Sequence, residues 1–156
     1  MKKFLAYSLV VMTLSIILQG NILYAQPSVK DSNLEVKAFV SGFTFPTSML
    51  FLDKNNIIVL EKEGTVRLVT NGILSPQPLL SLNVDTKNER GLLGIERIGD
   101  NVFLYATVKD GQVMNKIFKY TLAPGPKLIN QEVFKTLPGN PATNHQGGKL
   151  AVSNDG

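Results

Sequence analysis

Short apolar runs alternate with polar turn residues along most of the chain. The first set of runs covers residues 48–52, 57–60 and 65–69, each rich in β-branched or other large apolar side chains. Asp, Asn and Gly residues separate these runs, and Asn71-Gly72 is a strong hairpin signal because both residue types tolerate positive φ. This punctuation predicts antiparallel strands joined by tight turns.

A second set of runs repeats the pattern further along the chain. Its expected strands cover residues 92–95, 102–108, 116–121 and 132–137. Met49 and Leu93 occupy comparable places about 44 residues apart, and a third set begins at Gly147. After the N-terminal segment nothing sustains a helical period for three turns. Four-stranded meanders at this interval predict an all-β fold, a partial β-propeller of about two blades and the start of a third. A propeller needs at least four blades, so we expect this chain to be an N-terminal part that stops before the ring closes.

The first 25 residues have the features of a signal peptide. Lys2 and Lys3 supply the positive start, residues 4–18 supply the apolar stretch, and Ala25 offers a small residue at the cut. Leu23 is large for its place two residues before the cut, which leaves a retained membrane anchor as the alternative. Cleavage would give an exported protein, periplasmic or extracellular, with no further membrane span.

Three segments follow from this pattern. They are the signal peptide at 1–25, a polar lead-in segment at 26–38, and the truncated propeller domain at 39–156.

Composition excludes several classes of function. The 156 residues are 44% hydrophobic and 18% charged, as in ordinary globular proteins. The net charge is +4, and it falls to +2 when Lys2 and Lys3 are removed, since 14 basic residues then face 12 acidic ones. No basic cluster remains, which argues against a nucleic-acid partner. The chain has no cysteine, so disulfides and thiolate chemistry are excluded.

His145 is the only histidine and the first candidate for chemistry. Gly147 and Gly148 follow it and would let the backbone pass close to a ligand, while the apolar run after them would hold the imidazole in place. An imidazole can take up a proton near neutral pH. A zinc site is not expected because no second histidine and no cysteine is present. A solvated loop histidine with no function is the alternative.

The segment 88–94 is the second candidate. Gly91 and Gly94 would permit tight packing of an inner strand, and Glu89 would then point toward the central channel, where a carboxylate usually meets a ligand or a metal. A loop that merely enters a strand would have the same pattern. The segment is not a phosphate loop, because the lysine and the helix of that motif are missing. Residues 61–63 are expected to form a solvated hairpin rim.

Four segments together resemble one family, the glucose/sorbosone dehydrogenases. They are, in order, residues 45–48, 59–67, 89–94 and 145–150, and the likeness covers about residues 40–156. This family includes soluble quinoprotein sugar dehydrogenases, which are six-bladed β-propellers that use pyrroloquinoline quinone and calcium.

The resemblance implies an oxidoreductase that acts on CH–OH groups of an aldose or related polyol and passes electrons to an external acceptor. It implies that His145 is the general base and that Glu89 and Asn144 contact the quinone. Asn144 stands where the glucose enzymes have an aspartate, and Glu89 stands where some members have a glutamine. No metal ligand is expected in this chain, because the family's calcium ligands and cationic partners lie beyond Gly156. The chain by itself is therefore expected to be inactive.

Two other readings remain open from the residues. An exported β-propeller could bind a carbohydrate or a protein partner without catalysis, since a fold does not fix a function. A calcium-dependent lactone hydrolase on the same scaffold is the other.

Overall fold

The computed structural model describes residues 29–139 and 141–153, so the predicted signal peptide lies outside the described residues. The chain divides into two units, residues 1–37 and 38–156. In the first unit, described residues 29–37 form no strand, and the Asp31 carboxylate accepts a hydrogen bond from the Asn33 backbone N–H. All strands described below belong to the second unit, and the described residues contain no helix, as the sequence predicts.

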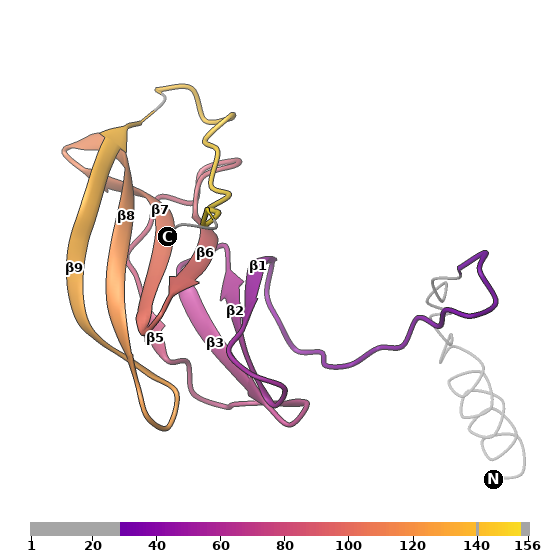
Figure 1. The fold of residues 1–156 in the computed structure, drawn as a ribbon. Coiled ribbons are helices and arrows are strands. Elements are labelled where there is room, and N and C mark those ends of the chain that lie inside the picture. Colours follow the sequence, from indigo (N-terminus) through magenta and orange to yellow (C-terminus); the bar gives the residue numbers. More distant parts are fainter. Residues whose placement is uncertain (1–28, 140, 154–156) are drawn as a thin grey trace, which may run out of the picture. The chain divides into compact units, whose positions relative to one another are not determined.

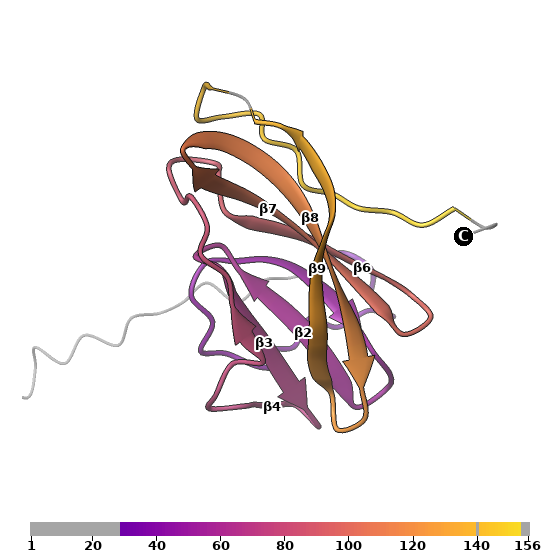
Figure 2. The ribbon, with the colours of Figure 1, turned by 90° about the vertical axis from the view of Figure 1, so that its left-hand side faces the viewer.

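Nine strands form two antiparallel sheets in the described part of the chain (Figures 1 and 2). The first sheet consists of β1 (Pro46–Phe51), β2 (Asn56–Glu61), β3 (Thr65–Thr70) and β4 (Ile73–Leu74) in that order, and β5 (Leu80–Ser81) pairs with β3. The second sheet consists of β6 (Leu92–Ile98), β7 (Asn101–Asp110), β8 (Gln112–Ala123) and β9 (Lys127–Pro138), also in chain order. Each sheet is a meander, which confirms the predicted repeat.

Side-chain alternation gives β2 two buried faces. Ile58 and Leu60 point to one face and are fully buried in the main core, together with Leu104 and other side chains of the second sheet. Ile57 and Val59 point to the other face and form a smaller cluster. The two sheets therefore pack against each other through one face of β2, in the manner of neighbouring layers.

The first strands of the two sheets lie beside each other and begin in the same way. In each, the register with the next strand shifts near its start, between Pro46 and Ser48 in β1 and between Leu92 and Gly94 in β6. The matching bulges set the repeat at about 46 residues, slightly longer than the interval between Met49 and Leu93 suggests. The Thr47 hydroxyl joins the strands by donating to the Leu92 carbonyl at 2.7 Å.

The segment after β9 returns to β6 (Figure 1). Its backbone comes so close to β6 that a methyl group added at Gly94 would collide with the Gly148 carbonyl, and one added at Gly148 would lie 2.6 Å from the Leu93 Cβ. The predicted tight packing at Gly94 is thus confirmed. Residues 147–153 form no strand in this structure, although a third set of strands was expected to begin at Gly147.

Candidate functional site

Two loops far apart in the sequence meet at one end of the second sheet. One loop leads from β5 into β6, and the other follows β9. The Glu89 backbone N–H donates to the Thr143 carbonyl at 3.1 Å, and the Asn88 side-chain amide donates to the Thr143 hydroxyl at 2.5 Å. We call the pair of segments 85–91 and 141–148 the loop clasp. The clasp contains all three predicted site residues, Glu89, Asn144 and His145.

Arg90 is the buried centre of the loop clasp. Its side chain is only 5% exposed, and it forms an ion pair of 2.8 Å with Asp85. The same guanidinium donates to the carbonyls of Pro141 and Ala142, at 3.1 and 3.2 Å. The planar, multiply donating guanidinium suits this role, because one group can bind a carboxylate and two carbonyls at once. Arg90 therefore ties the second loop to the first.

Asp85 is held in its charged form by the same arrangement. The backbone N–H of Lys87 donates to its carboxylate at 3.0 Å, and Arg90 lies on its other oxygen. These hydrogen bonds, with that of Lys87 the larger cause, hold the pKa of Asp85 below its ordinary value despite partial burial.

His145 sits on the exposed side of the loop clasp with an unusual backbone. Its φ is +57°, in the left-handed region that residues with a Cβ adopt only in a few per cent of cases, Asn, Asp and His more often than the others. Its backbone N–H donates to Glu89 Oε2 at 2.6 Å, across 56 residues of sequence. The imidazole is on an exposed residue, so a solute can reach it.

The residue after His145 anchors the loop. Gln146 is 4% exposed, and its side-chain amide donates to the carbonyls of Ala142 and Asn144. The buried Tyr105 hydroxyl of β7 donates to the Gln146 carbonyl at 2.5 Å. Burial raises the pKa of Tyr105, which keeps the phenol protonated as a donor. The histidine is thus exposed on a segment whose next residue is fixed.

The sequence predicted Glu89, Asn144 and His145 as site residues, and the structure brings all three together in the loop clasp. Asn144 and Glu89 are both exposed beside His145. At Gly148 the backbone passes close to β6, since a methyl group added there would lie 2.6 Å from the Leu93 Cβ. The approach of Gly147 and Gly148 to a ligand stays a prediction. The positioning residues Arg90, Gln146 and Tyr105 were missed. The role of Arg90 could have been predicted, because a cationic side chain directly before Gly91, at a turn expected to be tightly packed, needs an anionic or carbonyl partner.

The expectation that residues 61–63 form a solvated rim is wrong for Glu61. Its side chain is 6% exposed, accepts the Thr44 backbone N–H at 2.7 Å, and lies 3.6 Å from an Arg67 nitrogen. Burial here follows from the loop before β1, which covers the end of β2. Glu63 is exposed, as expected.

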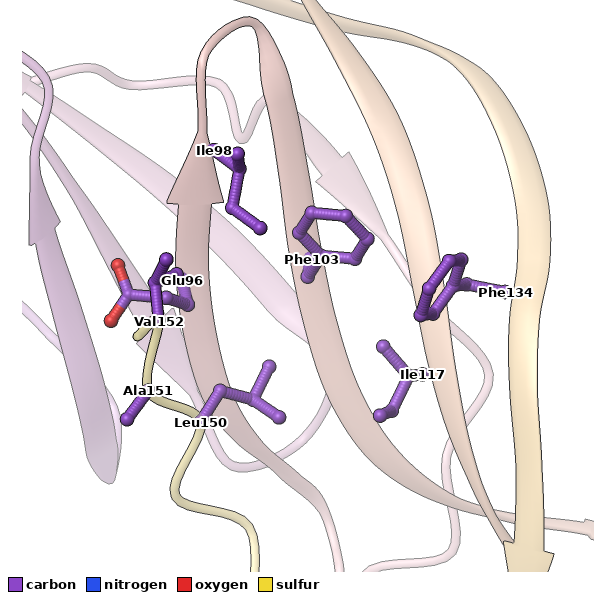
Figure 3. A pocket seen from close by; sticks show the side chains of 8 residues that line it. All are labelled: Glu96, Ile98, Phe103, Ile117, Phe134, Leu150, Ala151 and Val152. Atoms are coloured by element: carbon purple, nitrogen blue, oxygen red, sulfur yellow. The ribbon is translucent and has the colours of Figure 1, made fainter. Parts of the chain in front are cut away.

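The hollow shown in Figure 3 is a different kind of surface. Ile98, Phe103, Ile117 and Phe134 line it, with residues 150–152 along one side and Glu96 at its edge. Phe103 alternates with the core residue Leu104, so the hollow lies on the face of the second sheet that is turned away from the main core. Its lining is apolar and offers no acid, base or nucleophile beyond Glu96.

No metal centre gathers in residues 29–139 and 141–153, where no group of three or more His, Asp or Glu side chains could hold an ion. The described part of the chain also has no helix with the length and apolarity needed to cross a bilayer.

Comparisons with known proteins agree on one relationship. A family model described as glucose/sorbosone dehydrogenase matches residues 43–156. An uncharacterized protein of Synechocystis sp. is 26% identical in an alignment of length 153 that covers 84% of this chain and 37% of that protein. An oxidoreductase of Thermus thermophilus, described as a glucose dehydrogenase, has a TM-score of 0.67 at 28% identity and covers 76% of this chain and 37% of its own.

A second solved structure, of a glucose dehydrogenase, has a TM-score of 0.64 at 25% identity over 74% of this chain and 36% of its own. The chain therefore spans little more than a third of the length of these relatives. The two sheets match the corresponding part of their β-propellers, which confirms the predicted fold.

Proposed function

Because this chain belongs to the glucose/sorbosone dehydrogenase family, we propose that the protein containing it oxidises a CH–OH group of a sugar, an aldose or related polyol, with His145 as the general base. One observation carries the proposal. The only histidine of the chain is exposed, its φ is positive, and its backbone N–H donates to Glu89 of a distant loop. A histidine whose backbone is bound in this way can present its imidazole to a substrate in a constant direction.

The role of His145 is to remove the proton of the sugar hydroxyl. A neutral imidazole accepts that proton when one ring nitrogen comes within hydrogen-bond reach of the hydroxyl oxygen. The C–H hydrogen then leaves the same carbon as a hydride, so that proton and hydride removal together yield the carbonyl product. Gln146 and Tyr105 keep the loop in place while the exposed imidazole meets the substrate.

The residues beside His145 fit one side of a quinone. Pyrroloquinoline quinone, when bound, would accept the hydride, and an external acceptor would then take the electrons. The exposed Asn144 amide can donate hydrogen bonds to quinone or carboxylate oxygens, and the Glu89 carboxylate can accept one. Arg90 is not available to the quinone's carboxylates, since it is already bound to Asp85 and to the Pro141 and Ala142 carbonyls. We assign no step to calcium, because the described residues gather no ligand set for it.

Export is part of the proposal. Lys2, Lys3 and the apolar stretch at 4–18 support a signal peptide that is cleaved after Ala25. The N-terminal sequence of the mature protein would then begin at Gln26. An intact Met1 would instead support a retained anchor.

The deciding experiment uses the full-length protein and its His145→Gln variant. Quinone absorbance should shift on binding to both proteins, whereas turnover with sugar and a dye acceptor should fall roughly 10²- to 10⁴-fold in the variant. Asn71→Gln is the matched control, since Asn71 is also exposed with positive φ but lies in the β3–β4 turn. Equal turnover in wild type and His145→Gln would contradict the proposal. Sugar binding without turnover in wild type would favour a non-catalytic propeller.

A further inference from the structure

The Glu89 carboxylate contacts the backbone of His145 and not its imidazole. Glu89 Oε2 accepts the His145 N–H at 2.6 Å. We infer that Glu89 is a positioning residue, whose carboxylate holds the His145 backbone in its left-handed conformation and so fixes the direction of the imidazole. The catalytic consequence rests on the proposed function of His145, whereas the backbone contact does not.

His145 needs an external contact to keep this conformation. A left-handed backbone disfavours a residue with a Cβ by roughly 5- to 30-fold in population relative to the ordinary regions. A hydrogen bond to a charged acceptor favours the conformation that makes it by roughly 10- to 100-fold. The contact from Glu89 is therefore of the right size to offset the cost.

Glu89 can apply this contact because its own backbone is fixed. Its N–H is bound to the Thr143 carbonyl, and the next residue, Arg90, is buried and bound to Pro141 and Ala142. An exposed carboxylate on a free loop would contribute little. Here the carboxylate and the residue it holds are attached to the two halves of one clasp, so little freedom is lost when the hydrogen bond forms.

Three substitutions separate positioning from general support of the fold. Glu89→Ala removes the acceptor, Glu89→Gln keeps an acceptor oxygen without the charge, and Glu63→Ala removes an exposed carboxylate from the β2–β3 turn. In the full-length enzyme loaded with quinone, we expect Glu89→Ala to lower kcat roughly 10- to 100-fold with a smaller change in KM for sugar. Glu89→Gln should recover most of kcat, and Glu63→Ala should match wild type.

The backbone contact is tested without activity in the full-length protein labelled with 15N-histidine. The His145 amide signal is the one that disappears in His145→Gln. We expect Glu89→Ala to move this signal upfield and to speed its hydrogen exchange roughly 10- to 100-fold, while Glu89→Gln has a smaller effect.

An unchanged amide signal and exchange rate in Glu89→Ala would overturn the inference, as would Glu89→Gln losing as much kcat as Glu89→Ala. Either result leaves the proposed function standing if His145→Gln is inactive. Conversely, an active His145→Gln enzyme would remove the proposed function while a shifted amide would still establish the contact.

Discussion

Glu61 and Glu89 perform the same local task in different surroundings. Each accepts a backbone N–H from a loop distant in sequence, Glu61 from Thr44 at 2.7 Å and Glu89 from His145 at 2.6 Å. The Glu89 contact is made to a left-handed residue, His145 with φ of +57°, whereas the Glu61 contact is made to Thr44, and the left-handed residue there is the next one, Phe45, with φ of +46°. The two contacts differ in burial. The Glu61 side chain is 6% exposed and has Arg67 beside it, whereas Glu89 is exposed and its neighbour Arg90 is paired with Asp85.

The difference shows that a carboxylate bound to a distant backbone N–H can either stabilise the packed interior or fix a residue at the surface. A buried carboxylate must be paired, because an isolated buried charge is costly, and Glu61 with Arg67 closes the corner where the chain enters β1. An exposed carboxylate carries no such cost. Next to Glu89, Arg90 forms its ion pair with Asp85 and not with Glu89. The Glu89 carboxylate is therefore available to bind the His145 backbone at the surface.

The largest predicted effect on stability is at Glu61. Glu61→Ala should lower the free energy of unfolding by about 3 kcal/mol, because it removes a buried carboxylate that accepts the Thr44 N–H and lies beside the partly buried Arg67 guanidinium. Glu89→Ala should lower it by less than about 1 kcal/mol, because the lost hydrogen bond is largely offset when the His145 backbone leaves its left-handed conformation. Urea unfolding of both variants measures the two losses of stability. Equal losses of unfolding free energy in Glu61→Ala and Glu89→Ala would contradict the prediction that burial makes Glu61 the more important of the two.

The Asp85–Arg90 pair should give a smaller, pH-dependent effect. Asp85→Asn should cost about 2 kcal/mol at neutral pH by weakening a hydrogen-bonded ion pair. The pKa of Asp85 is lowered in the folded protein, so its contribution is present above the ordinary value of 3.8 and is lost as the pH falls below it. The wild type and Asp85→Asn should therefore converge in stability on acidification. A gap that stays constant from neutral to acid pH would contradict this assignment.

The strands were predictable because their signals are local. Runs of β-branched residues between Asn, Asp and Gly turns located β1 to β3 and β6 to β9. The two-residue strands β4 and β5 were not predicted, since they exist only as partners of β3 and have no period of their own.

The candidate site was predictable in its members but not in its contacts. His145 stood out as the only histidine, and Glu89 through the glycines that follow it. That the Glu89 carboxylate would bind the His145 backbone depends on a fold that brings residues 56 positions apart together. The burial of Glu61 and of Arg90 could not be predicted from the sequence for the same reason: their hydrogen-bond partners lie on loops distant in sequence.

The smallest predicted effect compares two buried tyrosines. Burial raises the pKa of both, that of Tyr120 to about 12. The Tyr105 hydroxyl donates to the Gln146 carbonyl, whereas that of Tyr120 finds no hydrogen-bond partner among the residues the structure describes. Tyr105→Phe should therefore lower the free energy of unfolding by about 1 kcal/mol, and Tyr120→Phe should leave it unchanged or raise it slightly.

This pair tests the loop clasp without touching a charge. In Tyr105→Phe, hydrogen exchange of the His145 and Gln146 amides should quicken, because the carbonyl that anchors the loop loses its buried donor. In Tyr120→Phe the same amides should exchange as in wild type. If both variants leave the exchange of these amides unchanged, the contacts of Glu89 and Arg90 hold the loop without help from Tyr105. The anchoring role given to the Tyr105 hydroxyl would then be wrong.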